Sequence, residues 1–328
     1  MPTSFGDTLA ARVQARRSQI VLGLDPDPSA LWPVASEPEL DASAGDASVE
    51  EASVADTSAA AVFPDGSSAA ERAAGAVVVH CRALIDATAD ACVAVKPQLA
   101  CFERLGAPGW SALVAVVEHA RASGLLVIAD GKRGDISVSA TAYAQGLIGG
   151  IETPFGAVAG LGADIVTVNP LMGADAVEPF VAAARAAGAG VLALVRTSNP
   201  GAADVEDLEL AGGGMVWERL AAIVEELGAP GVGESGLSDV GAVVGATVPG
   251  HLARARELMP HATFLLPGVG AQGGRVEDLA PAFAPGRAGG LVTASRSIAG
   301  AYLVAGGDPA AAARAEAERL RAEAWKLG

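Results

Sequence analysis

Apolar runs of strand length alternate with helix-like stretches along most of the chain, and this alternation restricts the fold more than any other feature. Near-continuous apolar strands separated by helices are typical of a parallel sheet that helices cover on both faces. Eight such units favour an α/β fold with a closed (β/α)8 TIM barrel over an open doubly wound sheet, and no GxGxxG motif follows the first run. The runs span residues 19–25, 92–97, 125–130, 163–169, 190–197, 240–246, 262–267 and 290–295.

One segment interrupts the alternation. Residues 35–70 are rich in Ala, Ser, Asp and Glu and show little periodicity, which predicts a disordered, solvated insertion after the first strand. We therefore expect one barrel domain over residues 1–328 that carries this insertion. A first helix is predicted to end near residue 17, and later helix-like stretches span 68–90, 109–122, 175–187, 213–227, 249–258 and 308–326.

Polar residues gather at or just beyond the carboxyl ends of the predicted strands. In a barrel these ends share one face, which is where enzymes with this fold place their active sites. A single polar residue at a strand end is weak evidence, but seven of the eight strands contribute one. The residues are Asp25, Lys96, Asp130, Asn169, Thr197 with Ser198, Pro267, and Ser295 with Arg296.

The charge of the chain limits its partners. A formal net charge of −16 disfavours binding to nucleic acid or to an anionic membrane, because the long-range field repels polyanions. A small anionic substrate is still allowed where cations converge. The longest apolar stretch, 73–95, contains His80, Arg82, Asp86 and Asp90, and the N-terminus lacks the pattern of a secretion signal, so we expect a cytoplasmic protein.

Lysine is scarce in this chain. Of 22 basic residues three are Lys (Lys96, Lys132 and Lys326), which leaves 19 Arg. A lysine kept against this bias indicates a task that a wide guanidinium cannot perform, such as giving up a proton. Lys326 lies in the terminal tail, so the other two require the explanation.

Both of these lysines are predicted to lie beside Asp130. Asp130 and Lys132 are two residues apart, so in an extended chain they point to the same side, with Gly131 allowing close backbone approach. Lys96 ends the preceding strand, and neighbouring strands lie about 5 Å apart. The three charges should alternate in sign within contact distance, and Asp135 could close the array from its own subunit or from a partner. A purely structural salt-bridge cluster is the alternative, and the scarcity of lysine favours a functional site.

No metal or organic cofactor is expected. Cys81, Cys92 and Cys101 lie 11 and 9 residues apart, without a CxxC motif or paired His, which predicts buried reduced thiols. The four His have no acid or nucleophile at motif spacing, and Ser235 lacks the GxSxG pattern of serine hydrolases.

At the level of whole motifs the chain resembles the orotidine 5'-phosphate decarboxylase family, and most closely its longer bacterial branch. The segment from Asp130 to Ile136 is similar to the family's DxKxxDI signature, and further motifs follow in the family's order outside residues 35–70. They are Leu24-Asp25-Pro26, Val95-Lys96-Pro97-Gln98 with Phe102-Glu103, Asn169-Pro170, Arg196-Thr197-Ser198-Asn199-Pro200-Gly201, Val243 to Thr247, Leu266 to Gly274, and Ala294 to Ile298.

The resemblance implies a role for each matching residue. Lys96, Asp130, Lys132 and Asp135 would be catalytic: Lys96 orients the acids, Asp130 lies beside the scissile carboxylate, and Lys132 delivers a proton to C6. Asp135 and Ile136 would come from the other subunit of a homodimer with shared active sites. Substrate binding would use Asp25 at the ribose, Ser198 at the pyrimidine edge, and Gln272 and Arg296 at the phosphate with Pro267 beside them. Ile136, Ser139, Asn169 and Ser295 would also bind the substrate. Ser139 stands where the family pattern has Thr, which keeps the hydroxyl.

The implied activity is decarboxylation of orotidine 5'-phosphate to uridine 5'-phosphate without a cofactor, a step of de novo pyrimidine synthesis. Two alternatives stay open at this point. A sister barrel acting on a keto-sugar phosphate would need a divalent ion. A catalytically dead barrel would bind a phosphorylated ligand without turnover, although the intact Asp130, Lys132 and Asp135 argue against it.

Overall fold

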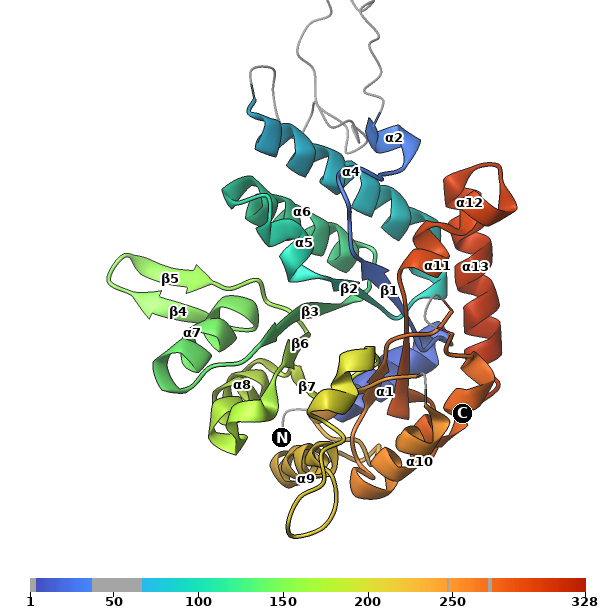
Figure 1. The fold of residues 1–328 in the computed structure, drawn as a ribbon. Helices are drawn as coiled ribbons and strands as arrows, with labels where there is room; N and C mark the ends of the chain where they lie inside the picture. The colour runs from blue at the N-terminus through green and yellow to red at the C-terminus, as the bar shows by residue number, and fades with distance from the viewer. Residues whose placement is uncertain (1–3, 37–66, 247, 271–272) are drawn as a thin grey trace, which may run out of the picture.

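The eight apolar runs form the strands of one closed parallel barrel in the computed structural model (Figure 1). The strands neighbour one another in the order β1-β10-β9-β8-β7-β6-β3-β2, which confirms the predicted fold class. The structure describes residues 4–36, 67–246, 248–270 and 273–328. The barrel strands are β1 (Ile20–Leu24), β2 (Ala94–Pro97), β3 (Leu126–Arg133), β6 (Ile165–Val168), β7 (Gly190–Arg196), β8 (Val240–Val244), β9 (Phe264–Leu266) and β10 (Gly290–Ala294).

Helices surround the barrel and connect its strands (Figure 1). Each predicted helix is present, with bounds that differ by a few residues. The α-helices are α1 (Phe5–Arg16), α2 (Pro33–Ser36), α4 (Ala69–Thr88), α5 (Leu99–Glu103), α6 (Ala107–Ala122), α7 (Ser137–Leu147), α8 (Ala174–Ala187), α9 (Val216–Gly228), α10 (Pro249–Leu258), α11 (Arg296–Ala299), α12 (Ala301–Ala305) and α13 (Pro309–Ala324). The longer 3-10 turns are η3 (Pro200–Asp204) and η5 (Val276–Phe283).

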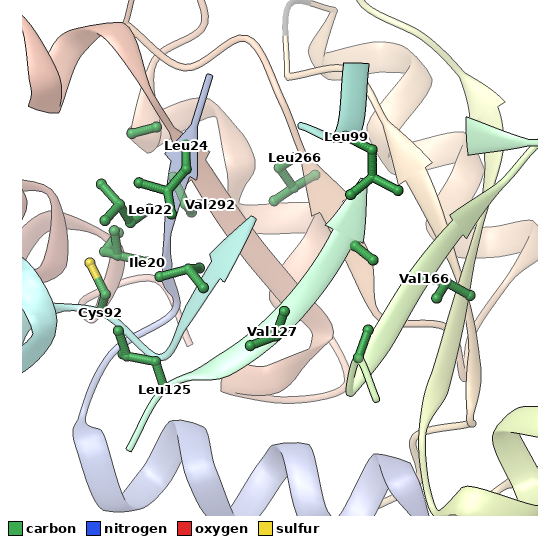
Figure 2. Packing of buried hydrophobic residues seen from close by; sticks show 14 of the residues in the cluster. Ile20, Leu22, Leu24, Cys92, Leu99, Leu125, Val127, Val166, Leu266 and Val292 are labelled. Atoms are coloured by element: carbon green, nitrogen blue, oxygen red, sulfur yellow. The ribbon is translucent and has the colours of Figure 1, made fainter. Parts of the chain in front are cut away.

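Alternate residues of each strand face opposite sides of the barrel wall. Ile20, Leu22 and Leu24 of β1 belong to the larger apolar cluster, which lies between the strands and the helices (Figure 2). Val21 belongs to a second cluster that takes side chains from all eight strands and therefore fills the barrel interior. Members of this inner cluster are Val21, Ala94, Leu126, Ile128, Ile165, Leu192, Val243, Leu265 and Leu291, and Phe5, Leu9 and Val13 of α1 pack against them. Strand parity thus decides which side chains face the barrel axis.

The segment between β3 and β6 contains elements that the sequence patterns did not predict. Helix α7 buries Ala140, Ala144 and Leu147, and a face made mostly of alanine gives a weak amphipathic signal. The antiparallel hairpin of β4 (Gly150–Thr153) and β5 (Gly156–Ala159) follows it and projects from the barrel (Figure 1). Its short strands are almost entirely exposed, so they lack the alternating pattern of a half-buried strand.

The predicted insertion at 35–70 falls mostly outside the described residues. At its edges, Ala35 and Ser36 end α2, and Ser68 is the N-cap of α4. Ser68 accepts a hydrogen bond from the Glu71 backbone, and the Glu71 side chain accepts one from the Ser68 backbone, which is a capping box. The disorder of the insertion stays a prediction.

A buried arginine ties α10 to the neighbouring β9 to β10 region. Nη1 of Arg256 donates to the carbonyls of Met259 and Ala262 at 2.7 and 2.8 Å, and Nη2 donates to those of Ala282 and Gly289 at 2.8 and 3.0 Å. Burial lowers the pKa of Arg256 to about 10, so the group stays charged at neutral pH. The guanidinium satisfies carbonyls from separate turns of the chain.

Replacing Arg256 with methionine should therefore cost much of the fold's stability. Methionine keeps the apolar stem but removes the guanidinium donor from these carbonyls, and a buried acceptor without a partner costs about 1–3 kcal/mol. Since some carbonyls will find water, we expect a loss of about 3–5 kcal/mol in the free energy of unfolding, measured by urea denaturation. Arg254→Met, on the same helix but exposed, is the control and should cost less than about 1 kcal/mol. Equal losses in the two variants would contradict this role.

Candidate active site

The inward-facing side chains change from apolar to polar at the carboxyl ends of the strands. On β3 the inner residues run Leu126, Ile128 and then Asp130, and on β2 Lys96 follows Ala94 with the same parity. Lys96 is 6% and Asp130 4% exposed, so both charges lie within the barrel mouth. The barrel geometry thus brings residues 34 positions apart in sequence into one site.

Three charges of alternating sign form the centre of this site. Lys96 Nζ donates to Asp130 Oδ2 at 2.7 Å, and Lys132 Nζ donates to Asp130 Oδ1 at 2.7 Å. Lys96 Nζ also lies 3.8 Å from Oδ1 of Asp25 at the end of β1. The predicted contact among Lys96, Asp130 and Lys132 is confirmed. The Lys96 side chain is 8% exposed and that of Lys132 42% exposed, so Lys132 is the end of the array that a ligand can approach.

The electrostatics of the array keep its buried members charged. Burial by itself would raise the pKa of Asp130, but Lys96 and Lys132 outweigh it and lower the pKa to about 2. Burial likewise opposes the charge on Lys96, and Asp130 with Asp25 outweighs it, so the pKa of Lys96 lies above its usual value. At neutral pH the array therefore holds a fixed carboxylate between two ammonium groups.

Acid should remove the stability that the charged Asp130 contributes. Its folded-state pKa of about 2 lies below the usual 3.8 of an unfolded chain, so the contribution is present above that value and is lost as the pH falls toward 2. A shift of this size corresponds to about 2 kcal/mol. We expect the difference in unfolding free energy between the wild type and Asp130→Asn to narrow by that amount over this pH range in urea titrations. A difference that does not change with pH would contradict the assignment.

The backbone at Lys132 differs from the extended chain that the sequence predicted. The pairing of β3 with β6 shifts register between Ala129 and Arg133, and Lys132 has a φ of 46°, in the left-handed region. The condition of an extended chain therefore fails at Lys132 itself, although this residue lies within β3 and its side chain still reaches Asp130. A non-glycine residue in this region is strained and requires support from its surroundings.

A pocket of about 230 Å³ opens beside the array and extends toward the loops after β9 and β10. Three residues predicted to bind the substrate, Pro267, Ser295 and Arg296, line it together with Lys96 and Lys132. The loop after β9 passes through glycines with φ of 100° and 74° (Gly268 and Gly270), a conformation that side chains disfavour. Gln272 lies outside the described residues. The complete lining is Asp25, Lys96, Gln98, Asp130, Lys132, Val243, Leu265, Pro267, Gly268, Val269, Thr293, Ser295, Arg296 and Ser297.

The other predicted site residues that the structure describes do not line this pocket within the single chain. Ile136 and Ser139 are exposed around the start of α7, and Oδ1 of the half-buried Asp135 accepts a hydrogen bond from the Ile136 backbone at 2.8 Å. Asn169 Oδ1 caps the turn after β6 by accepting from the Leu171 backbone at 3.0 Å.

Ser198 follows β7 and lies against Gly245, where an added Cβ would be 3.0 Å from the Ser198 Cβ. This contact places Ser198 at the β7–β8 side of the barrel mouth, next to the pocket-lining strand β8.

Two polar side chains at the array had no role assigned from the sequence, although Gln98 belongs to a matching motif. Gln98 Nε2 donates to Asp130 Oδ2 at 3.2 Å, and Thr167 Oγ1 donates to Asp130 Oδ1 at 2.8 Å. Thr167 has the inward parity of Ile165, and Asn169 stands two residues further on. Parity counted from the apolar residues was the signal that could have identified Thr167.

The structure gives two further findings on partners. Among the residues it describes, no group of three or more His, Cys, Asp or Glu side chains is arranged to hold a metal ion. In the same part of the chain, no helix has the length and apolar composition needed to cross a membrane.

The fold and the site define an α/β-barrel protein with a lysine–aspartate array at its carboxyl-terminal mouth, next to an arginine-bearing pocket. The chain belongs to the orotidine 5'-phosphate decarboxylase / HUMPS family, whose sequence profile matches residues 54–315. The orotidine 5'-phosphate decarboxylase of Deinococcus radiodurans is 48% identical over 216 residues, which cover 66% of this chain and 74% of that protein. The enzyme of that name from Rhodopirellula baltica is 42% identical over 232 residues, covering 70% and 74%.

A solved structure gives the same result. The OMP decarboxylase of Leishmania donovani superposes with a TM-score of 0.66 at 29% identity, over 98% of this chain and 99% of that one. The predicted family is therefore confirmed.

Proposed function

We propose that this protein decarboxylates orotidine 5'-phosphate to uridine 5'-phosphate and CO2 without a metal or cofactor, as a cytoplasmic step of pyrimidine nucleotide synthesis. The observation that carries the proposal is the Lys96–Asp130–Lys132 array, which faces a pocket on its Lys132 side. Arg296 lines the same pocket. Relatives of that name at 42–48% identity favour this substrate over a keto-sugar phosphate.

The chemistry requires a cation next to C6 of the pyrimidine. When the bond from C6 to the carboxylate breaks, CO2 leaves and the electron pair remains on C6, where the ring cannot delocalise it. The ammonium of Lys132 stabilises this charge and then transfers a proton to C6, and the resulting amine recovers a proton from water. Arginine would be a poor replacement, because a guanidinium holds its proton too tightly.

Asp130 has two roles in this scheme. It orients the ammonium of Lys132 through the 2.7 Å contact, and Lys96 and Gln98 hold its other oxygen. Its carboxylate would also repel the substrate carboxylate, a repulsion that the departure of CO2 relieves. The first role depends on contacts that are present before the substrate binds, so we give it more weight than the second.

The rest of the substrate is bound by groups around the pocket. Asp25 contacts the ribose hydroxyls with Lys96, and Ser198 holds the pyrimidine edge. Arg296, Ser295 and Gln272 bind the phosphate, with Pro267 beside them. Loops after strands seven and eight are the usual phosphate site of such barrels, and Arg296 follows the eighth barrel strand. Binding energy from the distant phosphate can lower the barrier by offsetting the cost of orientation at C6.

The protein acts as a homodimer in which Asp135, Ile136 and Ser139 enter the partner's site. Within one chain, Asp135 accepts a hydrogen bond from the Ile136 backbone. The ion pair that the structure describes for Lys132 is with Asp130 and not with Asp135. From Ser137 to Leu161 the only charged residue is Glu152, although the chain has a net charge of −16. Two such chains can approach without strong repulsion at a face of this composition, and interface cores are depleted of charge.

The hairpin that follows α7 gives a second reason to expect a subunit interface at this face. Ile151 is 42%, Val158 54% and Phe155 99% exposed. An isolated two-stranded hairpin is marginally stable in water, so the partner subunit would stabilise β4 and β5 by covering them.

The deciding experiment is a decarboxylation assay with chelator present, which follows the loss of the orotate absorbance. Turnover that is unaffected by chelator supports the proposal. Turnover of a keto-sugar phosphate that requires added divalent ion would favour the sister-barrel alternative, and binding of uridine 5'-phosphate without turnover would favour a non-catalytic barrel.

A further inference from the structure

Thr167 places a buried hydroxyl beneath the ion array. Its side chain lies on β6, and the residue is 1% exposed. Thr167 Oγ1 donates to Asp130 Oδ1 at 2.8 Å and accepts from the backbone N–H of Lys132 at 2.9 Å. A carboxylate only accepts and a backbone N–H only donates, so both hydrogen bonds of this hydroxyl have a fixed direction.

The hydroxyl lies where β3 leaves its regular pairing with β6. Ala129 pairs with Val166, and the next paired residues are Arg133 and Val168, so three residues of β3 face Thr167 alone. Lys132 has its left-handed φ of 46° in this bulge. A strained residue of this kind persists only where its surroundings determine it, and the Thr167 hydroxyl supplies a partner for the Lys132 N–H.

The same hydroxyl binds the Asp130 oxygen that Lys132 binds. Oδ1 of Asp130 accepts from Lys132 Nζ and Thr167 Oγ1, while Oδ2 accepts from Lys96 and Gln98. When Lys132 gives its proton to the substrate, Oδ1 loses its cationic partner. Thr167 then keeps this oxygen in place, because its own hydrogen bond does not depend on that proton.

We infer that Thr167 is a positioning residue, whose hydroxyl couples the strained backbone of Lys132 to the carboxylate of Asp130 and so aims the Lys132 ammonium. The inference rests on the proposed function. Without the hydroxyl, residues 131–133 can relax toward an extended strand, and the ammonium loses its alignment with C6. Misalignment of a reacting group lowers the rate of the chemical step more than it lowers substrate binding.

Thr167→Ser and Thr167→Ala make a matched pair, because both lose the methyl group and only the second loses the hydroxyl. We expect Thr167→Ala to lower kcat by about 10- to 100-fold with KM changed less than about threefold, and Thr167→Ser to stay within about fivefold of the wild type. Steady-state rates measured over a range of orotidine 5'-phosphate concentrations, up to saturation, separate the two parameters. Equal kcat values for the two variants would overturn the inference.

A pH profile separates positioning from a general loss of packing. Asp130 faces Lys96, Lys132 and the Thr167 hydroxyl, and Asp25 lies 3.8 Å from Lys96. Removing one donor to the carboxylate raises the pKa of Asp130, so the acidic limb of kcat should move to higher pH in Thr167→Ala but not in Thr167→Ser. An unmoved limb in Thr167→Ala would count against the coupling.

Thr263→Ala is the control for packing. Thr263 is also buried, but it precedes β9 at the opposite end of the barrel, and its hydroxyl donates to the Ala288 carbonyl at 3.0 Å. It should lower Tm without changing kcat or its pH profile. Lys132→Ala separates the role of Lys132 from the positioning role of Thr167. A Lys132→Ala enzyme as active as the wild type would overturn the proton-donor role of Lys132 on which the inference rests, whereas an inactive one beside an unaffected Thr167→Ala would overturn this inference alone.

Discussion

Replacing Lys132 with alanine is expected to lower kcat for decarboxylation by at least about 10⁴-fold. Proton delivery by a positioned side chain contributes about 10²- to 10⁴-fold, and fixed charge at the reacting centre about as much again. The substitution removes both contributions, because Lys132 is the exposed end of the array and faces the pocket. Single-turnover measurements with excess enzyme would report the chemical step directly.

Two further lysine variants test whether the lower kcat results from the loss of the proton donor. Lys132→Arg keeps a positive charge near Asp130 but holds its proton, so it should remain at least about 10²-fold below the wild type. Lys326→Ala removes the lysine of the terminal tail and should leave kcat unchanged. A Lys132→Ala enzyme that folds normally and turns over near the wild-type rate would exclude Lys132 as the proton donor.

Mixing two inactive variants is expected to restore activity if Asp135 serves the partner's site. Lys132→Ala and Asp135→Ala homodimers should each be at least about 10²-fold less active than the wild type. In a mixed dimer with shared sites, one site carries both substitutions and the other carries neither. With equal amounts and random exchange, about half of the dimers are mixed, so about one quarter of the wild-type activity should return.

The opposite arrangement predicts a different result. If Asp135 acts in the site of its own chain, every site of a mixed dimer contains one substitution and no activity returns. Mixing Lys132→Ala with Asp130→Ala is the control, because Asp130 and Lys132 contact each other within one chain and cannot complement. Subunit exchange is followed by native mass spectrometry, so that a failure to exchange is recognised.

Much of the fold followed from local pattern. The strand runs carry enough apolar residues to be buried on both faces, and their number and the helices between them predicted a closed barrel that the structure confirms. The position of the site followed as well, because the carboxyl ends of parallel strands meet at one face. Among the elements that escaped prediction, α7 has an alanine-rich face and the β4–β5 hairpin has exposed strands, and neither produces a periodic signal.

The sequence by itself predicted that Lys96, Asp130 and Lys132 lie together, because strand parity and strand order place Lys96 beside Asp130, and Lys132 is only two residues further along the chain. The tertiary structure alone decided how they are held. The left-handed backbone of Lys132 results from a register shift between β3 and β6, and the Thr167 hydroxyl that supports it comes from a strand 35 residues away. Such contacts depend on the pairing of distant strands, and the local sequence does not determine strand register precisely enough to predict them.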